Sequence, residues 1–246
     1  MGAGHCRVGR ALGPRLDSRL RPPRAPWTVG GRATPGRGLD HRDEFSAVTD
    51  RRLLFARTTL EIISAKGLHA LTHRAVDEAA GVPAGSVNYY APTRSKLMQL
   101  ALGAARQLMW DIAMVSFAPM TDVSNLDEDV VLDCTTDFVL KMATDGESFV
   151  KAYYAILVEA QFDAELFAEI MRQRTMFIEF TQPFVSVFEP NHTERVAELV
   201  VALMEGLIQQ QALVAAETFP RSVIRGMIAR IFGFQGGEVP VRERVD

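Results

Sequence analysis

The chain of 246 residues has few cysteines, no long hydrophobic run and no alternation of polar and apolar residues. Its two cysteines, Cys6 and Cys134, are too few for a disulfide framework, and no group of Cys and His has the spacing of metal ligands. No run reaches the roughly eighteen apolar residues that a membrane-spanning helix needs, and residues 1–40 lack the apolar core of a signal peptide. We therefore expect a cytoplasmic protein without a metal, a cofactor or a membrane partner.

Charge is distributed unevenly along the chain, although the net charge is only −3. Residues 1–42 hold nine arginines and two aspartates, residues 43–100 are nearly neutral, and residues 101–246 hold eleven basic and twenty-two acidic side chains. Nucleic acid attracts basic surfaces and repels acidic ones. If the protein binds DNA, we expect a few well-placed side chains within 43–100 to make the contacts.

Composition divides the chain into four predicted parts. Residues 1–45 are rich in Gly, Pro and Arg and have no hydrophobic period, which predicts a disordered basic extension. This extension is either an arm that binds DNA phosphates or a stretch upstream of the natural start codon. Residues 46–92 are predicted to form a small helical domain, residues 93–235 a helical bundle, and residues 236–246 a polar tail. The expected fold class is all-α.

Capping residues and glycines set the predicted helix boundaries in the small domain. Asp50 is the expected N-cap of a first helix that ends at Lys66-Gly67. Thr72 is expected to cap a second helix that runs to Ala80. Gly81 breaks this helix, and a third helix is predicted from Ala84 to Tyr90.

The bundle is predicted to contain long helices only. Thr93 caps the first of them, which continues to about Phe117. Pro190-Asn191-His192 is a clear break between two later helices. After Phe117 the periodicity predicts helices at 127–145, 147–162, 164–188, 193–217 and 220–232.

Three short helices within about forty residues, the last two joined by a glycine turn, have the arrangement of a helix-turn-helix. Gly81 lets the chain reverse without a Cβ clash, and Ala79, Ala80 and Ala84 keep the helix contact close. The outer face of the third helix is then free to enter a DNA major groove, which is wide enough for one helix.

The residues of this motif resemble a known family. The stretch LTHRAVDEAAGVPAGSVNYY, Leu71 to Tyr90, closely resembles the DNA-binding domain of the TetR family of repressors, in the subgroup with THRAV in the second helix and AGVPxG in the turn. The resemblance covers about fifty residues and extends through Thr93-Arg94-Ser95-Lys96-Leu97. The later part of the chain is similar in architecture and in the phrase LMEGL at 203–207.

The resemblance implies roles for the side chains of this domain. Thr72, Arg74, Arg94 and Lys96 are expected at the DNA backbone. The third helix is expected to approach the bases, where Asn can pair with adenine. Its predicted contact residues are Ala84, Gly85, Ser86, Asn88, Tyr89 and Tyr90, of which the two tyrosines either reach the DNA or pack.

Two positions depart from the family pattern. The family usually has an aromatic residue where Ala91 stands, and Tyr90 or Phe55 is expected to fill that space. The family often has a lysine where Ala84 stands, so one phosphate contact is expected to be missing.

Methionines and aromatic residues recur on the middle helices. They are typical of an ordinary core, but the resemblance implies an apolar cavity for a small effector, and such side chains repack around varied shapes. Gln107, Thr135 and Gln161 could orient a ligand there. The predicted ligand-binding residues are Met109, Trp110, Met114, Phe117, Phe138, Met142, Tyr154 and Phe177, with Tyr153 and Phe180 in the same cluster.

The resemblance also implies a homodimer that pairs through the helices at 164–188 and 193–217 and binds a palindromic operator. The expected function is that of a repressor that a small apolar or amphipathic effector releases from double-stranded DNA. Two alternatives stay open: a helical enzyme that uses carboxylates such as Glu159, Asp163, Glu165 and Glu169, and a DNA-binding protein without an effector. A cavity of small-molecule size would discriminate between them.

Overall fold

The computed structural model describes residues 41–120, 126–214 and 218–234 and is helical in each of these ranges, with no strand among them. The predicted all-α class is confirmed. The predicted extension and the polar tail lie almost wholly outside the described residues.

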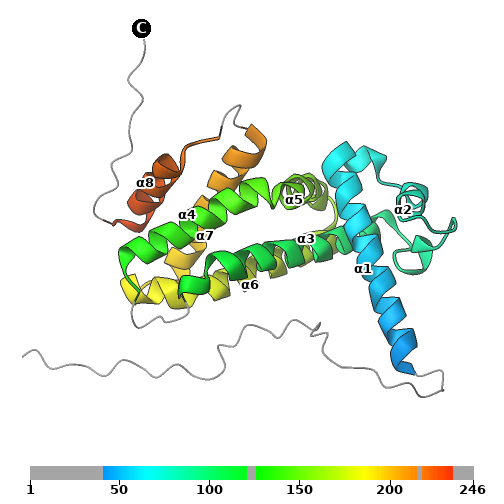
Figure 1. The fold of residues 1–246 in the computed structure, drawn as a ribbon, viewed down its shortest axis with the longest axis horizontal. Helices are drawn as coiled ribbons and strands as arrows, with labels where there is room; N and C mark the ends of the chain where they lie inside the picture. The colour runs from blue at the N-terminus through cyan, green and yellow to red at the C-terminus, as the bar shows by residue number, and fades with distance from the viewer. Residues whose placement is uncertain (1–40, 121–125, 215–217, 235–246) are drawn as a thin grey trace, which may run out of the picture. The chain divides into compact units, whose positions relative to one another are not determined.

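The first half of the described chain contains three short and two long segments of helix, whose arrangement Figure 1 shows. α1 begins at His41, so the predicted N-cap at Asp50 is wrong, because no glycine or proline interrupts the sequence between His41 and Lys66. The elements are α1 (His41–Lys66), η1 (Leu68–Ala70), α2 (His73–Ala79), η2 (Val87–Tyr89) and α3 (Arg94–Ser116).

The second half follows the predicted boundaries within a few residues, and aspartate N-caps hold two of its helix starts. Asp127 and Asp163 accept hydrogen bonds from the first backbone amides of α4 and α6. The elements are η3 (Ala118–Met120), α4 (Glu128–Thr144), α5 (Glu147–Ala160), α6 (Ala164–Phe188), α7 (Thr193–Gln209), the π-helical turn η5 (Gln210–Val214) and α8 (Arg221–Phe232).

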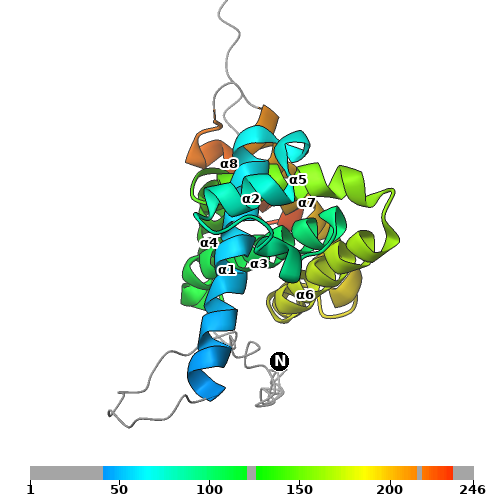
Figure 2. The ribbon, with the colours of Figure 1, turned by 90° about the vertical axis from the view of Figure 1, so that its right-hand side faces the viewer.

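α3 connects the two halves of the fold (Figures 1 and 2). It packs against α1, α4, α5 and α6, and its contact with α6 begins in its first turn, where Lys96 pairs with Glu165. Four residues in its first half are fully buried, so this part of the helix is fixed in the core: Leu97, Ala101, Leu102 and Ala105. α3 therefore links the N-terminal helices to the C-terminal bundle through one continuous helix.

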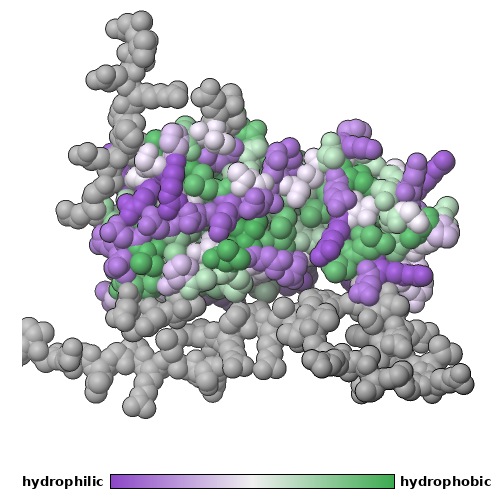
Figure 3. Space-filling model, in the orientation of Figure 1, coloured by the Kyte–Doolittle hydropathy of each residue, from purple (hydrophilic) through white to green (hydrophobic). Residues whose placement is uncertain are grey.

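Ion pairs join α8 to α4. Arg225 pairs with Asp129 and Asp133, and Arg221 pairs with Asp133 and Asp137. The three aspartates are spaced four residues apart, so they lie on one face of α4. Figure 3 shows hydrophilic side chains gathered over these two helices. Ile224 and Ile228 of α8 are buried, so apolar packing rather than exposed charge supplies most of the attachment.

Within the described residues, Thr193–Val214 is the one segment that is long and apolar enough to cross a membrane by composition alone. It carries charges at Arg195, Glu198 and Glu205 and buries Val201 and Met204 in the core. This is the pattern of an amphipathic helix that packs on a protein core.

Candidate nucleic-acid interface and ligand cavity

A buried carboxylate holds the turn between α2 and η2. Asp77 is 3% exposed, and its two oxygens accept hydrogen bonds from the backbone amides of Gly85 at 2.7 Å and Val87 at 2.8 Å. Val87 is fully buried beneath the segment. The backbone of residues 85–87 is thus fixed from below by one side chain of α2.

The predicted helix over 84–90 is wrong in its first half. Residues 84–86 form a turn, and only Val87–Tyr89 are helical, as a single 3-10 turn. Gly85 has a φ of +90°, which is outside the helical region and which side chains of L-residues rarely adopt. Gly81 also has a positive φ, of +67°, as expected for the reversal after α2.

This short segment presents its polar side chains outward. Ala84, Asn88 and Tyr89 are exposed, with Tyr89 at 84%, and Ser86 is half-buried. Tyr90 instead packs its ring on Phe55, with centroids 5.2 Å apart, above the fully buried Ala91. Tyr90 therefore packs against Phe55, and the filling of the space beside Ala91 by these rings stays a prediction.

The start of α2 lies beside this segment. Thr72 caps α2, since its hydroxyl accepts a hydrogen bond from the amide of Ala75, and its side chain is exposed. Arg74 is also exposed. The Nε2 atom of His73 lies 2.7 Å from the carbonyl oxygen of Ala91, which joins the start of α2 to the chain just after η2.

Arg94 has a different set of partners from the predicted ones. Its guanidinium donates to the carbonyl oxygens of Leu71 at 2.7 Å and Leu68 at 2.6 Å. Leu68 begins η1 and Leu71 lies between η1 and α2, so Arg94 ties the start of α3 to the connection between the first two helices. The structure therefore gives Arg94 a role in positioning, and a phosphate contact by Arg94 stays a prediction.

Lys96 is engaged with the C-terminal half of the chain. Its ammonium donates to the carboxylate of Glu165 and to the Gln99 side chain at 3.0 Å. The contact holds the pKa of Glu165 below its ordinary value. Because Glu165 is in the first turn of α6, Lys96 connects the predicted phosphate-binding edge to that helix.

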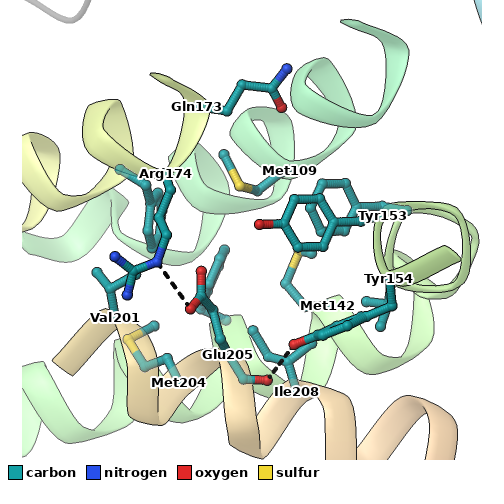
Figure 4. A pocket seen from close by; sticks show the side chains of 14 residues that line it. Met109, Met142, Tyr153, Tyr154, Gln173, Arg174, Val201, Met204, Glu205 and Ile208 are labelled. Atoms are coloured by element: carbon teal, nitrogen blue, oxygen red, sulfur yellow. Dashed lines mark hydrogen bonds and ion pairs between the residues drawn. The ribbon is translucent and has the colours of Figure 1, made fainter. Parts of the chain in front are cut away.

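A cavity of about 60 Å³ lies between α3, α4, α5, α6 and α7 (Figure 4). Five of the eight predicted ligand residues line it: Met109, Phe138, Met142, Tyr154 and Phe177. Tyr153 lines it as well. The residues that complete the lining are Phe149, Val150, Gln173, Arg174, Val201, Met204, Glu205 and Ile208.

Three predicted ligand residues do not reach this cavity. Met114 is 38% exposed on the opposite side of its helix, so the prediction for Met114 is not supported by its position. Trp110 packs edge-on against Phe177, with centroids 5.8 Å apart, and so lies behind the cavity wall. Phe117 lines a second, smaller cavity of about 20 Å³.

The polar residues considered from the sequence are also elsewhere. Gln107 donates to Asp111, and Gln161 is exposed and donates to a carbonyl of its own helix. Thr135 lines the second cavity.

An ion pair lies at the cavity wall instead. Arg174 Nε donates to Glu205 Oε2 at 3.3 Å, and the Tyr154 hydroxyl donates to the Glu205 carbonyl oxygen at 3.1 Å. Burial raises the pKa of the Glu205 carboxyl, against the opposing effect of Arg174. Burial and the charge of Glu205 raise the pKa of Tyr154 to about 12, so its hydroxyl remains a donor at neutral pH.

The charged residues of the cavity had only a weak signal in the sequence. Glu205 stands in the phrase LMEGL, among apolar residues of α7, and Arg174 occupies a position four residues after Ile170, which is buried. A charged residue in register with a buried stripe is the pattern that could have indicated them.

An apolar strip covers the outer side of α7. Leu199 is 57% exposed and Leu203 is 44% exposed, and the small residues Ala202 and Gly206 are exposed beside them. Small residues let another helix approach closely, so this strip is suited to helix pairing.

The C-terminal domain matches a family model. Residues 126–233 match the model described as "Tetracyclin repressor-like, C-terminal domain". The comparison with curated proteins gave no match.

The whole described fold is similar to that of solved regulators. A transcriptional regulator of Streptomyces coelicolor A3(2), SCO7518, is 22% identical over 74% of this chain and 98% of its own, with a TM-score of 0.58. The multidrug-binding protein EbrR in complex with imidazole is 19% identical over 80% and 98% of the two chains, with a TM-score of 0.58. A TetR-family regulator from Rhodococcus sp. is 17% identical over 75% and 96%, with a TM-score of 0.57.

The chain therefore has the fold of a TetR-type regulator, with a helix-turn-helix domain followed by a helical C-terminal domain. The family match covers the C-terminal domain, and the solved structures share the fold of the described chain.

Proposed function

We propose that the protein is a sequence-specific DNA-binding transcriptional regulator, a homodimeric repressor that a small apolar or amphipathic effector releases from its operator. The observation that carries the proposal is the reading segment 84–89. Its backbone is fixed by Asp77, while Asn88 and Tyr89 are exposed and free of intramolecular hydrogen bonds in the described structure. A fixed backbone that presents free polar side chains is what base readout requires.

DNA contact is assigned to the residues around this segment. Thr72, Arg74 and Lys96 flank it on both sides, and each has a donor suited to a phosphate oxygen. Asn88 and Tyr89 are assigned to base edges. The operator is proposed to be a palindrome, because a twofold dimer presents two copies of the segment to successive major grooves.

The dimer is proposed to form through α7 together with α6. The strip of Leu199, Ala202, Leu203 and Gly206 on α7 supports this assignment, because it is apolar, exposed and lined with small residues. The exposed apolar residues Phe167 and Val187 lie on α6.

A small-molecule effector is proposed because the C-terminal domain holds a cavity next to α3. Solved structures of EbrR, which share this fold, contain ethidium, proflavin or malachite green. The cavity residue Met109 and its neighbour Trp110 lie on α3, whose first turn carries Arg94 and Lys96. Occupation of the cavity can therefore move the DNA-facing end, and by linkage DNA must weaken effector binding by the same factor.

An enzymatic function has less support. Three of the four carboxylates considered for catalysis make structural contacts: Asp163 caps α6, Glu165 pairs with Lys96, and Glu169 pairs with Arg172. The proposed location is the cytoplasm, where operator DNA is accessible.

The proposal is tested by selecting binding sites for the full chain from a random DNA library. We expect a palindromic motif whose half-sites are about one helical turn apart or a multiple of it. Organic compounds that release the selected DNA should also change the fluorescence of Trp110, measured in a Trp27→Phe variant that leaves one tryptophan. Recovery of no motif would contradict the proposed function.

A further inference from the structure

Two cavities of the C-terminal domain meet at one side chain. Met204 lines both of them. Beside Met204, Phe177 of the first cavity packs on Phe180 of the second, with centroids 6.0 Å apart. Met has an unbranched side chain with three rotatable bonds and adapts readily to its surroundings. The two cavities therefore form the two ends of one elongated space, with an adaptable side chain between them.

The two ends of this space differ in polarity. The first cavity carries the charged pair Arg174 and Glu205. The second is lined by apolar side chains and by only two hydroxyls, those of Thr135 and Thr181. A ligand that fits both ends has a charged group at one end and an apolar body at the other.

The orientation of the charged pair favours a cation. Figure 4 shows the Glu205 carboxylate and the Tyr153 hydroxyl pointing toward the same space, while the terminal nitrogens of Arg174 point away from it. Only one Glu205 oxygen is bound to Arg174, through Nε. The faces of Phe177 and Tyr153, which line the same cavity, also attract positive charge.

We propose that this space binds an elongated organic monocation, with its positive group at Glu205 and its apolar body extending past Met204 into the second cavity. The proposal deepens the proposed function and rests on it for its regulatory meaning, but its binding chemistry can be tested without DNA. Cavities of about 60 and 20 Å³ are smaller than such a ligand, so it must displace flexible side chains. Met109, Met142 and Met204 are suited to this displacement.

The test uses the full-length Trp27→Phe variant, in which Trp110 reports on the site. Trp110 contacts Phe177 of the first cavity and Phe180 of the second. Butyl, hexyl, octyl and decyl trimethylammonium are titrated below their micelle-forming concentrations, beside carboxylates of matched length. We expect the ammonium affinity to rise about fourfold per added methylene, because each one is buried, and the carboxylates to bind at least tenfold more weakly. Tighter binding of the carboxylates would overturn the proposal.

Substitutions at the charged pair separate its two charges. Glu205→Gln should weaken the ammonium series about tenfold or more, whereas Arg174→Gln should leave its affinity unchanged or raise it. An equal loss of ammonium affinity in the two variants would show that the ion pair only stabilises the fold, and it would contradict a cation site.

Substitutions at the second cavity test its use. Val131→Phe fills part of this cavity. In this variant the affinity should rise with chain length only among the shorter members of the series and should not rise further for the longer ones. Met204→Ala opens the passage and should raise the affinity of the decyl member, so it tests the same point if Val131→Phe does not fold. A dependence on chain length that neither variant changes would rule out the extended site. If the ammonium pattern holds but no DNA motif is recovered, the proposed function fails and the ligand site stands.

Discussion

The helix-turn-helix domain that contains the reading segment, called the reading domain below, uses its polar groups differently from the ligand cavity. In the reading domain, Asp77, His73 and Arg94 contact backbone atoms, and each of them joins two segments of the chain. In the cavity, Arg174 and Glu205 contact each other through one side-chain hydrogen bond, and the Tyr154 hydroxyl donates to the Glu205 carbonyl oxygen. The first region therefore has backbone segments tied together at several points, whereas the second is lined by one charged pair and by flexible side chains.

This difference assigns stability and adaptability to separate parts of the protein. A DNA-reading surface gains specificity from a fixed backbone, because base contacts depend on geometry. A cavity lined by Met109, Met142 and Met204 gains breadth from side chains that repack. The predictions below test whether the reading domain is as fixed as its hydrogen bonds indicate.

The largest effect is expected at Asp77. Asp77→Ala leaves the backbone amides of Gly85 and Val87 without an acceptor, and Val87 is fully buried. We expect the free energy of unfolding of the reading domain to fall by about 3–5 kcal/mol, because two hydrogen bonds to a charge are lost. Hydrogen exchange at these two amides measures the change directly.

Asp77→Asn keeps one oxygen acceptor and should lie between the wild type and the alanine variant. Glu78→Ala, at the exposed neighbouring position, is the matched control and should change little. Unaltered exchange at Gly85 and Val87 in Asp77→Ala would show that other contacts fix the segment.

A smaller effect, confined to one base position, is expected at Asn88. Asn88→Ala removes an exposed amide that can pair with adenine, at a cost of about 1–3 kcal/mol in operator affinity. Site selection should return a motif that is relaxed at one position of each half-site. An unchanged motif would place Asn88 outside the base contacts.

Arg94→Ala is expected to lower the stability of the connection between α1 and α2 by about 1–2 kcal/mol. Two hydrogen bonds from a charged donor are lost, and their partial exposure to water reduces their contribution. Arg94→Lys should restore part of the loss.

The salt dependence of DNA binding decides between the two roles of Arg94. A positioning role leaves the slope of log affinity against log salt unchanged, whereas a phosphate contact would flatten it by about one unit. If Arg94→Ala flattens this slope and leaves the stability unchanged, Arg94 contacts a DNA phosphate, as predicted from the sequence.

The smallest effect is expected at the Lys96–Glu165 pair. Both side chains are largely exposed, so the pair contributes little to stability. Glu165→Gln, however, releases Lys96 from its partner and should raise DNA affinity a few-fold at low salt. Lys96→Gln should lower the affinity for all sequences alike. Reduced affinity in Glu165→Gln would show that the pair positions Lys96 for DNA rather than competing with it.

The sequence predicted the helices well because capping is local. Thr72, Thr93, Asp127 and Asp163 each accept hydrogen bonds from backbone amides two or three residues later, so the signal and the structure lie within one turn. The reading segment was less predictable. The positive φ of Gly85 depends on the distant acceptor Asp77, and helical spacing alone does not indicate it.

The cavity was only half predictable, for a related reason. Aromatic residues and methionines on α3 and α4 indicated apolar lining, and five of the predicted residues line the cavity. Arg174 and Glu205 resemble the charged residues of a solvated helix face. Only the packing of α6 on α7 brings them together. Arg94 was assigned to phosphate because its backbone partners lie 23 and 26 residues earlier in the chain.

The support that Asp77 gives to the reading segment has a consequence for how such a protein can diversify. Asp77 binds main-chain amides, and these are present whatever side chains residues 85 and 87 carry, within the φ that Gly85 requires. Ala84, Asn88 and Tyr89 are exposed and make no hydrogen bond that holds the fold. The proposed operator preference can thus be rewritten at Ala84 and Asn88 by selection or by design, much as antibody loops vary on a constant framework, whereas a change at Tyr89 also removes its edge contact with Tyr90.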